Sequence, residues 1–183
     1  MGRYRETYDR WKRDPEAFWA DAAREIDWSR PWNHVLSEEA GLSRWFAGAV
    51  CNTCWNALDR HVAMRGDQAA LVYDSAMTGK VKSFTYRELT EKVATFAGVL
   101  QSHGIGKGDR VIVYMPMVPQ AVVAMLACAR LGAIHSVVFG GFASGSLATR
   151  IDDATPKLIV SSDAGMRGGK AVPYKHLLDD AIS

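Results

Sequence analysis

The sequence predicts an α/β protein in which a helical, tryptophan-rich N-terminal extension precedes the first strand–helix units of a three-layer α/β domain. Two observations lead to this prediction. After residue 68, strand and helix patterns alternate, and the strands are continuously apolar, which is typical of parallel strands covered on both faces. All six tryptophans lie within the first 55 residues, so the two parts differ in composition. We place the extension at residues 1–67 and the α/β part at residues 68–183.

The extension is predicted to be mainly helical. Residues 14–16 (Asp-Pro-Glu) are a typical helix start, with proline in the first turn and acidic side chains near the positive end of the dipole. The helix that follows would present one apolar stripe, made of Phe18, Trp19, Ala22 and Ile26. Residues 28–32 (WSRPW) are expected to be irregular, and a second helix is predicted from about residue 52 to residue 60.

The α/β part begins with a hairpin of strands at residues 70–73 and 81–86. Thr85 and Glu88 then form a capping box that opens a helix, which Gly104 should end. The remaining predicted elements alternate: a strand at 110–115, a helix at 118–131, a strand at 134–139, a helix at 144–153, a strand at 157–162 and a helix at 174–183. Because only three parallel strands are present and the last helix has no Gly or Pro stop, we expect the chain to stop within a domain.

Composition excludes several classes of protein. With 183 residues, 48% hydrophobic and 23% charged, the chain has the composition of a globular protein. The net charge of +2 offers no electrostatic footprint for nucleic acid. The longest uncharged stretch, residues 111–129, contains two prolines and changes from strand-like to helix-like, so we expect no membrane span. Three cysteines without a disulfide framework and a charged N-terminus predict a cytoplasmic protein.

Three local patterns resemble known sites but lack the required context. Cys51 and Cys54 form a CxxC without a second ligand pair, so we expect them to share one buried helix face rather than bind zinc. Residues 104–109 (GIGKGD) follow a helix and open a strand, the reverse of a dinucleotide loop. Residues 165–171 (GMRGGKA) are one residue short of a P-loop and have Ala171 where a hydroxyl would hold magnesium. We predict no catalytic residue and no metal site in this chain.

Two loops are placed where α/β sheets bind ligands, beyond the carboxyl ends of strands. Residues 139–142 (FGGF) offer adjacent glycines for close approach to the backbone and flat aromatic faces for stacking. Residues 164–170 (AGMRGGK) offer two cations and exposed backbone amides, which suit phosphate. An aromatic face beside phosphate-binding cations favours a nucleotide-bearing ligand. Ordinary turns with surface cations are the alternative.

Long stretches of the chain resemble one family. VVFGGFASGSLATRIDDATPKLIVSSDAGMRGGKAVPYKHLLDDAI and GDRVIVYMPMVPQAVVAMLACARLGAIHSVVFGGF resemble the AMP-forming acetyl- and propionyl-CoA synthetases of the adenylate-forming superfamily. YDRWKRDPEAFWADAAREIDW is similar to the extension that precedes their adenylation domain. The resemblance covers essentially the whole chain, and the form RGGKAVPYKHLLDDAIS is closer to the propionyl-CoA enzymes.

The resemblance implies a two-step ligase for a small-molecule carboxylate. The carboxylate attacks the ATP α-phosphate, with magnesium, to give acyl-adenylate and pyrophosphate, and the CoA thiol then displaces AMP. It also implies that CoA contacts a set of seven residues, namely Phe139, Gly140, Gly141, Arg167, Gly168, Gly169 and Lys170. Arg167 is expected to pair with the CoA 3′-phosphate, and Lys170 stands where the family often has arginine.

Several functional readings stay open at this stage. The family's ATP loop, acyl pocket and C-terminal domain lie beyond Ser183, so we expect no ATP site and no ligase activity in the 183-residue chain alone. Propionate is the expected acid and acetate the alternative. A stand-alone CoA- or nucleotide-binding module, or an interaction domain built on the Trp-rich extension, is the alternative from a different class. The sequence carries no indication of oligomeric state.

Overall fold

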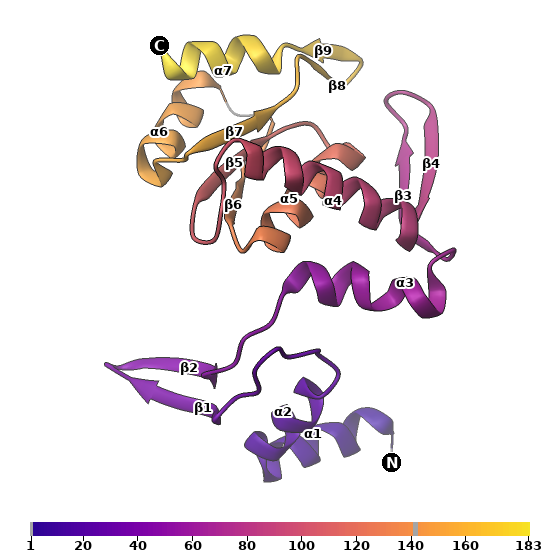
Figure 1. Cartoon of the computed structure of the whole chain (residues 1–183), viewed down its shortest axis with the longest axis vertical. Helices are drawn as coiled ribbons and strands as arrows, with labels where there is room; N and C mark the ends of the chain where they lie inside the picture. The colour runs from indigo at the N-terminus through magenta and orange to yellow at the C-terminus, as the bar shows by residue number, and fades with distance from the viewer. Residues whose placement is uncertain (1, 141–142) are drawn as a thin grey trace. The chain divides into compact units, whose positions relative to one another are not determined.

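The computed structural model describes residues 2–140 and 143–183, which fold into two compact units, Met1–Asn52 and Thr53–Ser183 (Figure 1). The boundary between the units precedes the one expected after residue 67. The reason is packing: Cys54 and Leu58 are buried in the core of the second unit beside Leu89. Residues 53–67 therefore belong structurally to the α/β part.

The first unit contains two helices and a hairpin. Its elements are α1 Arg3–Arg13, α2 Pro15–Ala23, β1 His34–Glu39 and β2 Leu42–Ala47. The predicted helix start is confirmed, because the Asp14 side chain accepts a hydrogen bond of 3.0 Å from the backbone N–H of Ala17. The helix ends at Ala23, so Ile26 lies beyond its end and does not belong to the apolar stripe that was predicted. The extension that was expected to be mainly helical also contains a hairpin, because β1 and β2 form an antiparallel pair.

Four of the five tryptophans of the first unit gather with Phe46 in one aromatic cluster around the hairpin. Phe46 of β2 lies 5.5 Å from Trp28 and 5.4 Å from Trp32 between ring centroids, and Trp19 of α2 lies 5.8 Å from Trp45. The Trp28 indole N–H donates to the Ala23 carbonyl at 2.7 Å. The aromatic residues therefore supply partly exposed packing in a unit whose buried hydrophobic residues, within the described part of the chain, are Ala23 and Val35.

The centre of the second unit is a parallel sheet of three strands in the order β6-β5-β7. The strands are β5 Arg110–Tyr114, β6 Ile134–Val137 and β7 Leu158–Ser161. The chain runs from β5 to β6 on one side and then crosses to β7 on the other, so β5 is the central strand. All four residues Val111–Tyr114 have an exposed fraction of 0%, as expected for a strand covered on both faces.

Alternate residues of β5 pack into different helix layers, which confirms the three-layer prediction. Val111 packs with α4 Tyr86–Ser102 and α5 Pro119–Leu131. Ile112 and Tyr114 pack with α6 Ser144–Ala154 and α7 Tyr174–Ile182, through buried side chains such as Leu147. The period-2 alternation of the strand therefore divides the core between two faces of the sheet.

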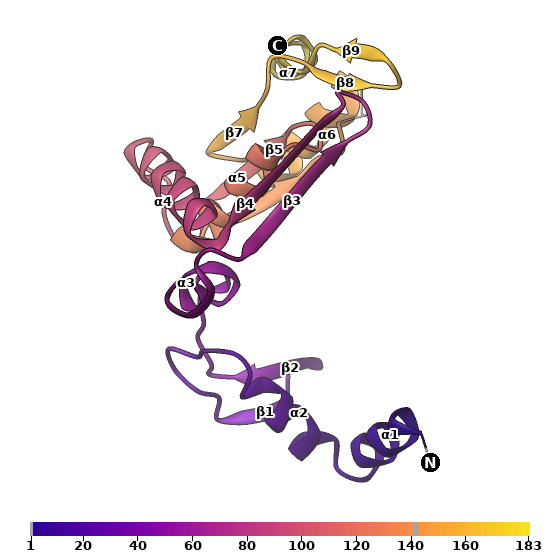
Figure 2. The same ribbon diagram turned by 90° about the vertical axis from the view of Figure 1, so that its right-hand side faces the viewer.

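The predicted hairpin and capping box precede the sheet. Strands β3 Ala69–Ser75 and β4 Lys80–Thr85 run side by side as an antiparallel ribbon (Figure 2). The Thr85 hydroxyl accepts from the Glu88 backbone N–H at 3.2 Å, and the Glu88 carboxylate accepts from the Thr85 N–H at 2.9 Å. These bonds hold the pKa of Glu88 below its usual range.

The helix predicted at residues 52–60 has a different form. It contains a π-helical turn, η1 Trp55–Asp59, followed by α3 Arg60–Arg65. Cys54 is buried, whereas Cys51 is exposed and precedes the turn, so the expectation of one shared buried face is wrong. The Asp59 carboxylate instead accepts two hydrogen bonds of 2.6 and 2.7 Å from Arg130 at the end of α5.

The segment Gly104–Asp109 is a turn that ends α4, as predicted. Gly104 adopts a φ of +76°, and the Gly106 N–H donates to the Asp109 carboxylate at 2.8 Å. Lys157 donates to the same carboxylate at 3.1 Å, which joins this turn to the segment before β7. The turn therefore has a structural role at the amino end of the sheet. Among the described residues, no helix is long and apolar enough to cross a membrane.

Candidate functional site

The candidate site lies at the carboxyl ends of the parallel strands. The segments that follow β6 and β7 leave the sheet at the same edge, on either side of the central strand β5. At this edge the Ser161 hydroxyl at the end of β7 donates to the Tyr114 carbonyl at the end of β5, at 3.0 Å. Open α/β sheets bind ligands at such an edge, particularly where neighbouring connections run to opposite sides.

The segment after β7 is a small hairpin rather than an irregular loop. It consists of β8 Gly165–Arg167 and β9 Lys170–Val172, joined by Gly168 and Gly169 with φ of +55° and +76°. Positive φ at both central residues is the requirement of a type I′ turn, which glycine meets without strain. The missed signal was the Gly-Gly pair between two short β-like runs.

This hairpin places the two predicted cations beside each other. Arg167 and Lys170 are direct partners across the antiparallel pair, so their side chains leave the same face of the hairpin. Within the described residues, neither cation forms an ion pair with a carboxylate. The hairpin end therefore carries two neighbouring positive charges in solvent.

The structure brings the two predicted segments together at Phe139 and Arg167. The Arg167 guanidinium carbon lies 5.0 Å from the centroid of the Phe139 ring, a cation–π contact between residues 28 positions apart. The Phe139 side chain is 60% exposed and lies beyond the end of β6. Gly141, which was predicted to border the same site, lies outside the described residues.

Tyr174, the first residue of α7, is a site neighbour that the sequence analysis did not identify. Its side chain is buried and packs against Gly140 and Gly165, one from each of the two segments. Burial raises the pKa of its phenol, and the nearby Arg167 charge opposes that rise. The missed signal was the Pro173–Tyr174 pair, which opens a helix directly after the cationic hairpin.

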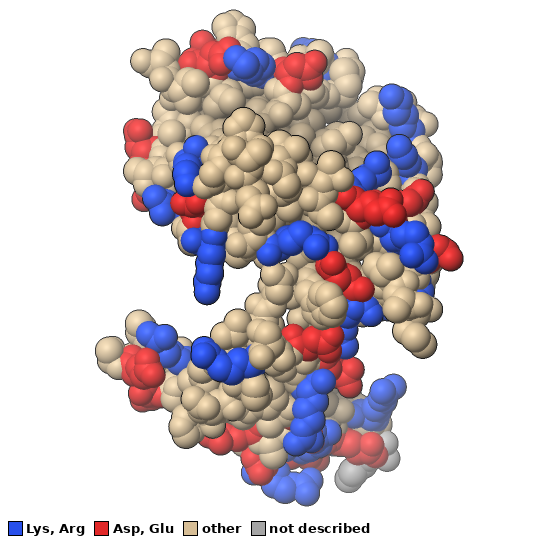
Figure 3. Space-filling view, in the orientation of Figure 1, with Lys and Arg blue, Asp and Glu red and all other residues tan. Residues whose placement is uncertain are grey.

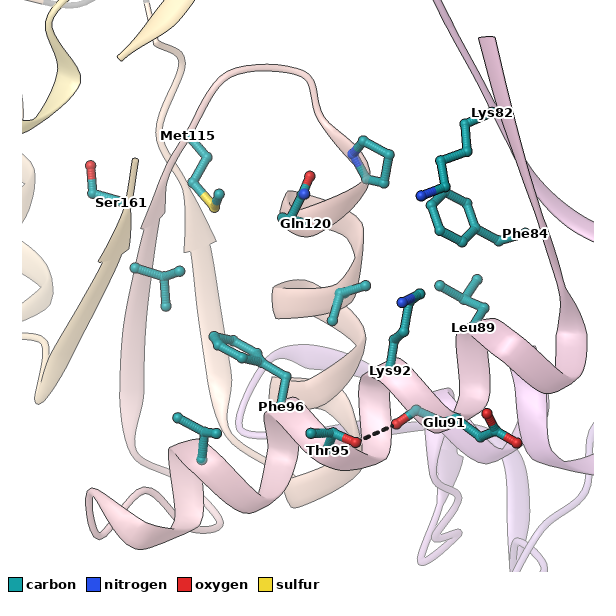
Figure 4. Close-up of a pocket in the computed structure, with 14 residues that line it drawn as sticks. Lys82, Phe84, Leu89, Glu91, Lys92, Thr95, Phe96, Met115, Gln120 and Ser161 are labelled. Carbon is teal, nitrogen blue, oxygen red and sulfur yellow. Dashed lines mark hydrogen bonds between the residues drawn. The ribbon is translucent and has the colours of Figure 1, made fainter. Parts of the chain in front are cut away.

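A separate cavity of about 670 Å³ lies between β4, α4, α5 and β7 (Figure 4). Its lining includes Phe96 and Met115, together with Lys82 and Lys92, whose ammonium groups lie 4.9 and 5.9 Å from the Phe84 ring centroid. None of the six described residues predicted to bind CoA lines this cavity. It therefore adds no group to the candidate site.

Within the part of the chain that the structure describes, neither the surface charges nor the metal-ligating side chains indicate a second candidate site. On the face seen in Figure 3, lysine and arginine are interspersed with acidic side chains over both units. Over residues 2–140 and 143–183, no group of three His, Cys, Asp or Glu side chains could hold a metal ion. The aromatic and cationic groups of Phe139, Arg167 and Lys170 are suited to binding a purine and phosphates rather than to bond-breaking chemistry.

The fold is an α/β domain with a central parallel sheet, and a smaller N-terminal unit precedes it in the sequence. Residues 58–181 match the family described as AMP-binding enzyme, and residues 4–57 match the acetyl-coenzyme A synthetase N-terminus. The chain therefore belongs to the AMP-binding enzyme family.

Several relatives resemble the chain over nearly its whole length. A propionate--CoA ligase of Escherichia coli (strain K12) is 52% identical over 98% of this chain and 29% of its own length. An acetyl-coenzyme A synthetase of Thiobacillus denitrificans is 53% identical over 100% of this chain and 28% of its own length. The structure of an acetoacetyl-CoA synthetase from Streptomyces lividans matches with a TM-score of 0.85 and 30% identity, over 94% of this chain and 27% of that one. The chain thus spans less than a third of the length of these relatives.

Proposed function

We propose that this chain carries the CoA-binding segments of an AMP-forming short-chain acyl-CoA synthetase. The whole reaction converts a carboxylate, ATP and CoA into acyl-CoA, AMP and pyrophosphate, with magnesium. The observation that carries the proposal is the contact between Phe139 and Arg167, with Lys170 beside it. It joins a flat aromatic face and two cations at the ligand-binding edge of the sheet.

The residues divide the recognition of the CoA nucleotide between base and phosphate. Phe139 and the guanidinium of Arg167 both offer flat faces on which a purine stacks. Arg167 also offers a planar fork of N–H donors that matches a phosphate, whereas Lys170 adds a point charge. We assign the 3′-phosphate to Arg167 and supporting charge to Lys170. Gly168 and Gly169 have open space beside their Cα atoms, which allows the ligand to approach the backbone there. We keep Gly140 and Gly141 as residues that border the site.

We assign neither ATP binding nor acid activation to this chain. The described residues include no P-loop, and Ala171 removes the hydroxyl that such a loop would need. The 183-residue chain incubated with ATP, Mg²⁺, propionate and CoA should therefore release no AMP. Detection of acyl-adenylate or AMP above a protein-free blank would contradict this assignment.

For the acid we propose propionate, on the form of residues 167–183, with acetate as the alternative. Relatives bearing either name match at nearly equal identity, 52% and 53%. The test is the ratio of kcat/KM for the two acids, measured on a longer protein that carries this sequence. Propionate should be preferred, and a preference for acetate would overturn this choice.

We also propose a cytoplasmic location, consistent with three free cysteines.

Calorimetric titration tests the CoA assignment, with dephospho-CoA as the ligand that lacks the 3′-phosphate. The chain should bind CoA more tightly than dephospho-CoA. Arg167→Ala should weaken CoA binding about 10- to 100-fold, the range of a charge-assisted hydrogen bond, and bring the two affinities together. Lys170→Ala should have a smaller effect of the same kind.

Lys82→Ala is the matched control, since Lys82 also lies over an aromatic ring of the second unit, at 4.9 Å from Phe84. It should leave both affinities within about twofold, because a rim cation remote from the ligand contributes little. Equal loss of CoA affinity in the Lys82 and Arg167 variants would overturn the assignment. Absence of CoA binding by the unsubstituted chain would overturn the proposed function. A stand-alone CoA-binding module would give the same binding results as part of an acyl-CoA synthetase. Acid activation, measured on a longer protein that carries this sequence, distinguishes these two functions.

A further inference from the structure

We infer that Tyr174 is a positioning residue for the CoA-nucleotide site: its ring separates the two segments that carry Phe139 and Arg167 and fixes their contact. The inference rests on the proposed function, because it concerns the same site. It adds a residue from a third element, α7, that acts through the two ligand-binding segments.

The Tyr174 ring is in close contact with both segments. A methyl group added at Gly140 would overlap the Tyr174 hydroxyl and lie 2.6 Å from Cε1. A methyl group added at Gly165 would lie 2.9 Å from Cε2 of the same ring and 2.8 Å from Cβ of Pro116. Because Cε1 and Cε2 are on opposite edges of the ring, Tyr174 lies between the two backbones. Only glycine allows such an approach at either position.

The ring itself is held by rigid elements. Its side chain is 4% exposed, and its centroid lies 5.0 Å from that of Tyr114, the last residue of the central strand. Pro173 precedes it, and the backbone N–H of Lys175 donates to the Asp163 carbonyl at 3.0 Å. The position of Tyr174 is therefore set by Tyr114 of the sheet and by the bond that ties the start of α7 to Asp163, just after β7.

The ligand-facing residues lie directly next to these glycines. Phe139 precedes Gly140, and Arg167 is two residues after Gly165 on the same strand, β8. A change in the ring shifts or loosens both backbones, and with them the 5.0 Å contact between Arg167 and Phe139. Residues that hold binding groups in this way control affinity without touching the ligand.

The test compares CoA and dephospho-CoA affinities of Tyr174 variants of the 183-residue chain. Tyr174→Ala should weaken CoA binding about tenfold, the scale that outer-shell partners contribute, and lower the CoA preference toward that of Arg167→Ala. Tyr174→Phe keeps the ring and should retain the preference. Since Tyr174 acts through Arg167, adding Tyr174→Ala to Arg167→Ala should change the preference no further.

Leu178→Ala is the matched control. Leu178 lies one turn further along α7, is 8% exposed and belongs to the same buried cluster, so its truncation removes core packing without altering the two glycine contacts. It should lower stability while keeping the preference for CoA. Tyr174→Leu, which keeps an apolar side chain of intermediate size, replaces Tyr174→Ala if the latter does not fold.

The outcomes separate the two proposals. If the unsubstituted chain does not bind CoA, the proposed function fails. If it prefers CoA and the folded Tyr174→Ala or Tyr174→Leu chain keeps that preference, the positioning role is overturned and the proposed function stands. An equal loss of preference in Leu178→Ala would also overturn the positioning role, since it would indicate a general effect of core packing.

Discussion

The ion pair between Asp59 and Arg130 joins the π-helical turn to the end of α5 across 71 positions of sequence. The exposed fractions of the two side chains are 18% for Asp59 and 27% for Arg130. The pair therefore lies between a surface pair, worth about 0–1 kcal/mol, and a fully buried pair, whose disruption costs about 3–5 kcal/mol. We expect Asp59→Ala to lower the free energy of unfolding of the second unit by about 2 kcal/mol.

The measurement is urea unfolding followed by far-UV circular dichroism. Tryptophan fluorescence is unsuitable, because all tryptophans except Trp55 belong to the first unit. Asp179→Ala is the control, because its ion pair with Lys175 lies at the surface: the side chains are 49% (Asp179) and 64% (Lys175) exposed. This substitution should lower the free energy of unfolding by no more than about 0.5 kcal/mol.

A double-mutant cycle isolates the pair from other effects of each substitution. Asp59→Ala and Arg130→Ala should show a coupling energy of about 1–2 kcal/mol, since the residues share two hydrogen bonds. Coupling below about 0.5 kcal/mol, or an Asp59→Ala loss equal to that of the control, would refute the role of this pair in holding residues 53–67 to the α/β part.

Three further predictions concern single groups. Thr85→Ala should cost about 1 kcal/mol in chemical unfolding, because it removes the helix cap, and an unchanged midpoint would contradict this. A backbone N–H and a nearby ammonium lower the pKa of Asp109, so its stabilisation is full at neutral pH and is lost as the pH falls through the lowered pKa. Asp109→Asn should therefore lower Tm at pH 7, and the difference should shrink as the pH falls below about 4, the ordinary pKa of an aspartate. A pH-independent loss would argue against this. Iodoacetamide at pH 8 should modify the exposed Cys51 alone, because burial raises the pKa of Cys54 and raises that of Cys128 to about 11. Intact mass showing more than one adduct before denaturation would contradict that accessibility.

The parallel sheet and its helices were predictable because local pattern and burial agree. The run Val111–Tyr114 is apolar on both faces and is fully buried, and Thr85 with Glu88 marks a helix start that the structure confirms. In these segments, propensity, periodicity and capping favour the same result.

The hairpin of the first unit was not predictable from the same signals. Its turn at Ala40 and Gly41 has φ of +51° and +77°, a type I′ geometry that is usually marked by Asn-Gly or Asp-Gly. The surrounding residues 36–42 (LSEEAGL) are rich in helix formers, so propensity favours the wrong element. Aromatic packing of Trp45 and Phe46 with the other rings of this unit outweighs that preference.

The candidate site was predictable in its residues and not in its construction. Strand ends and residue chemistry indicated Phe139 and Arg167, because the carboxyl ends of parallel strands share one edge. The contact between them depends on a hairpin and on Tyr174, whose position is set by α7 and Tyr114. Such close packing across three elements has no signature in local sequence.

Amide hydrogen exchange of the 183-residue chain, with and without saturating CoA, tests the central claim most directly. The proposed site predicts slower exchange with CoA in residues 164–172 and in the peptide that carries Phe139 and Gly140. Exchange in the β1–β2 hairpin should not change. Protection that is absent from residues 164–172, or that is confined to the α4 and α5 lining of the separate cavity, would contradict the assignment of this edge of the sheet to CoA.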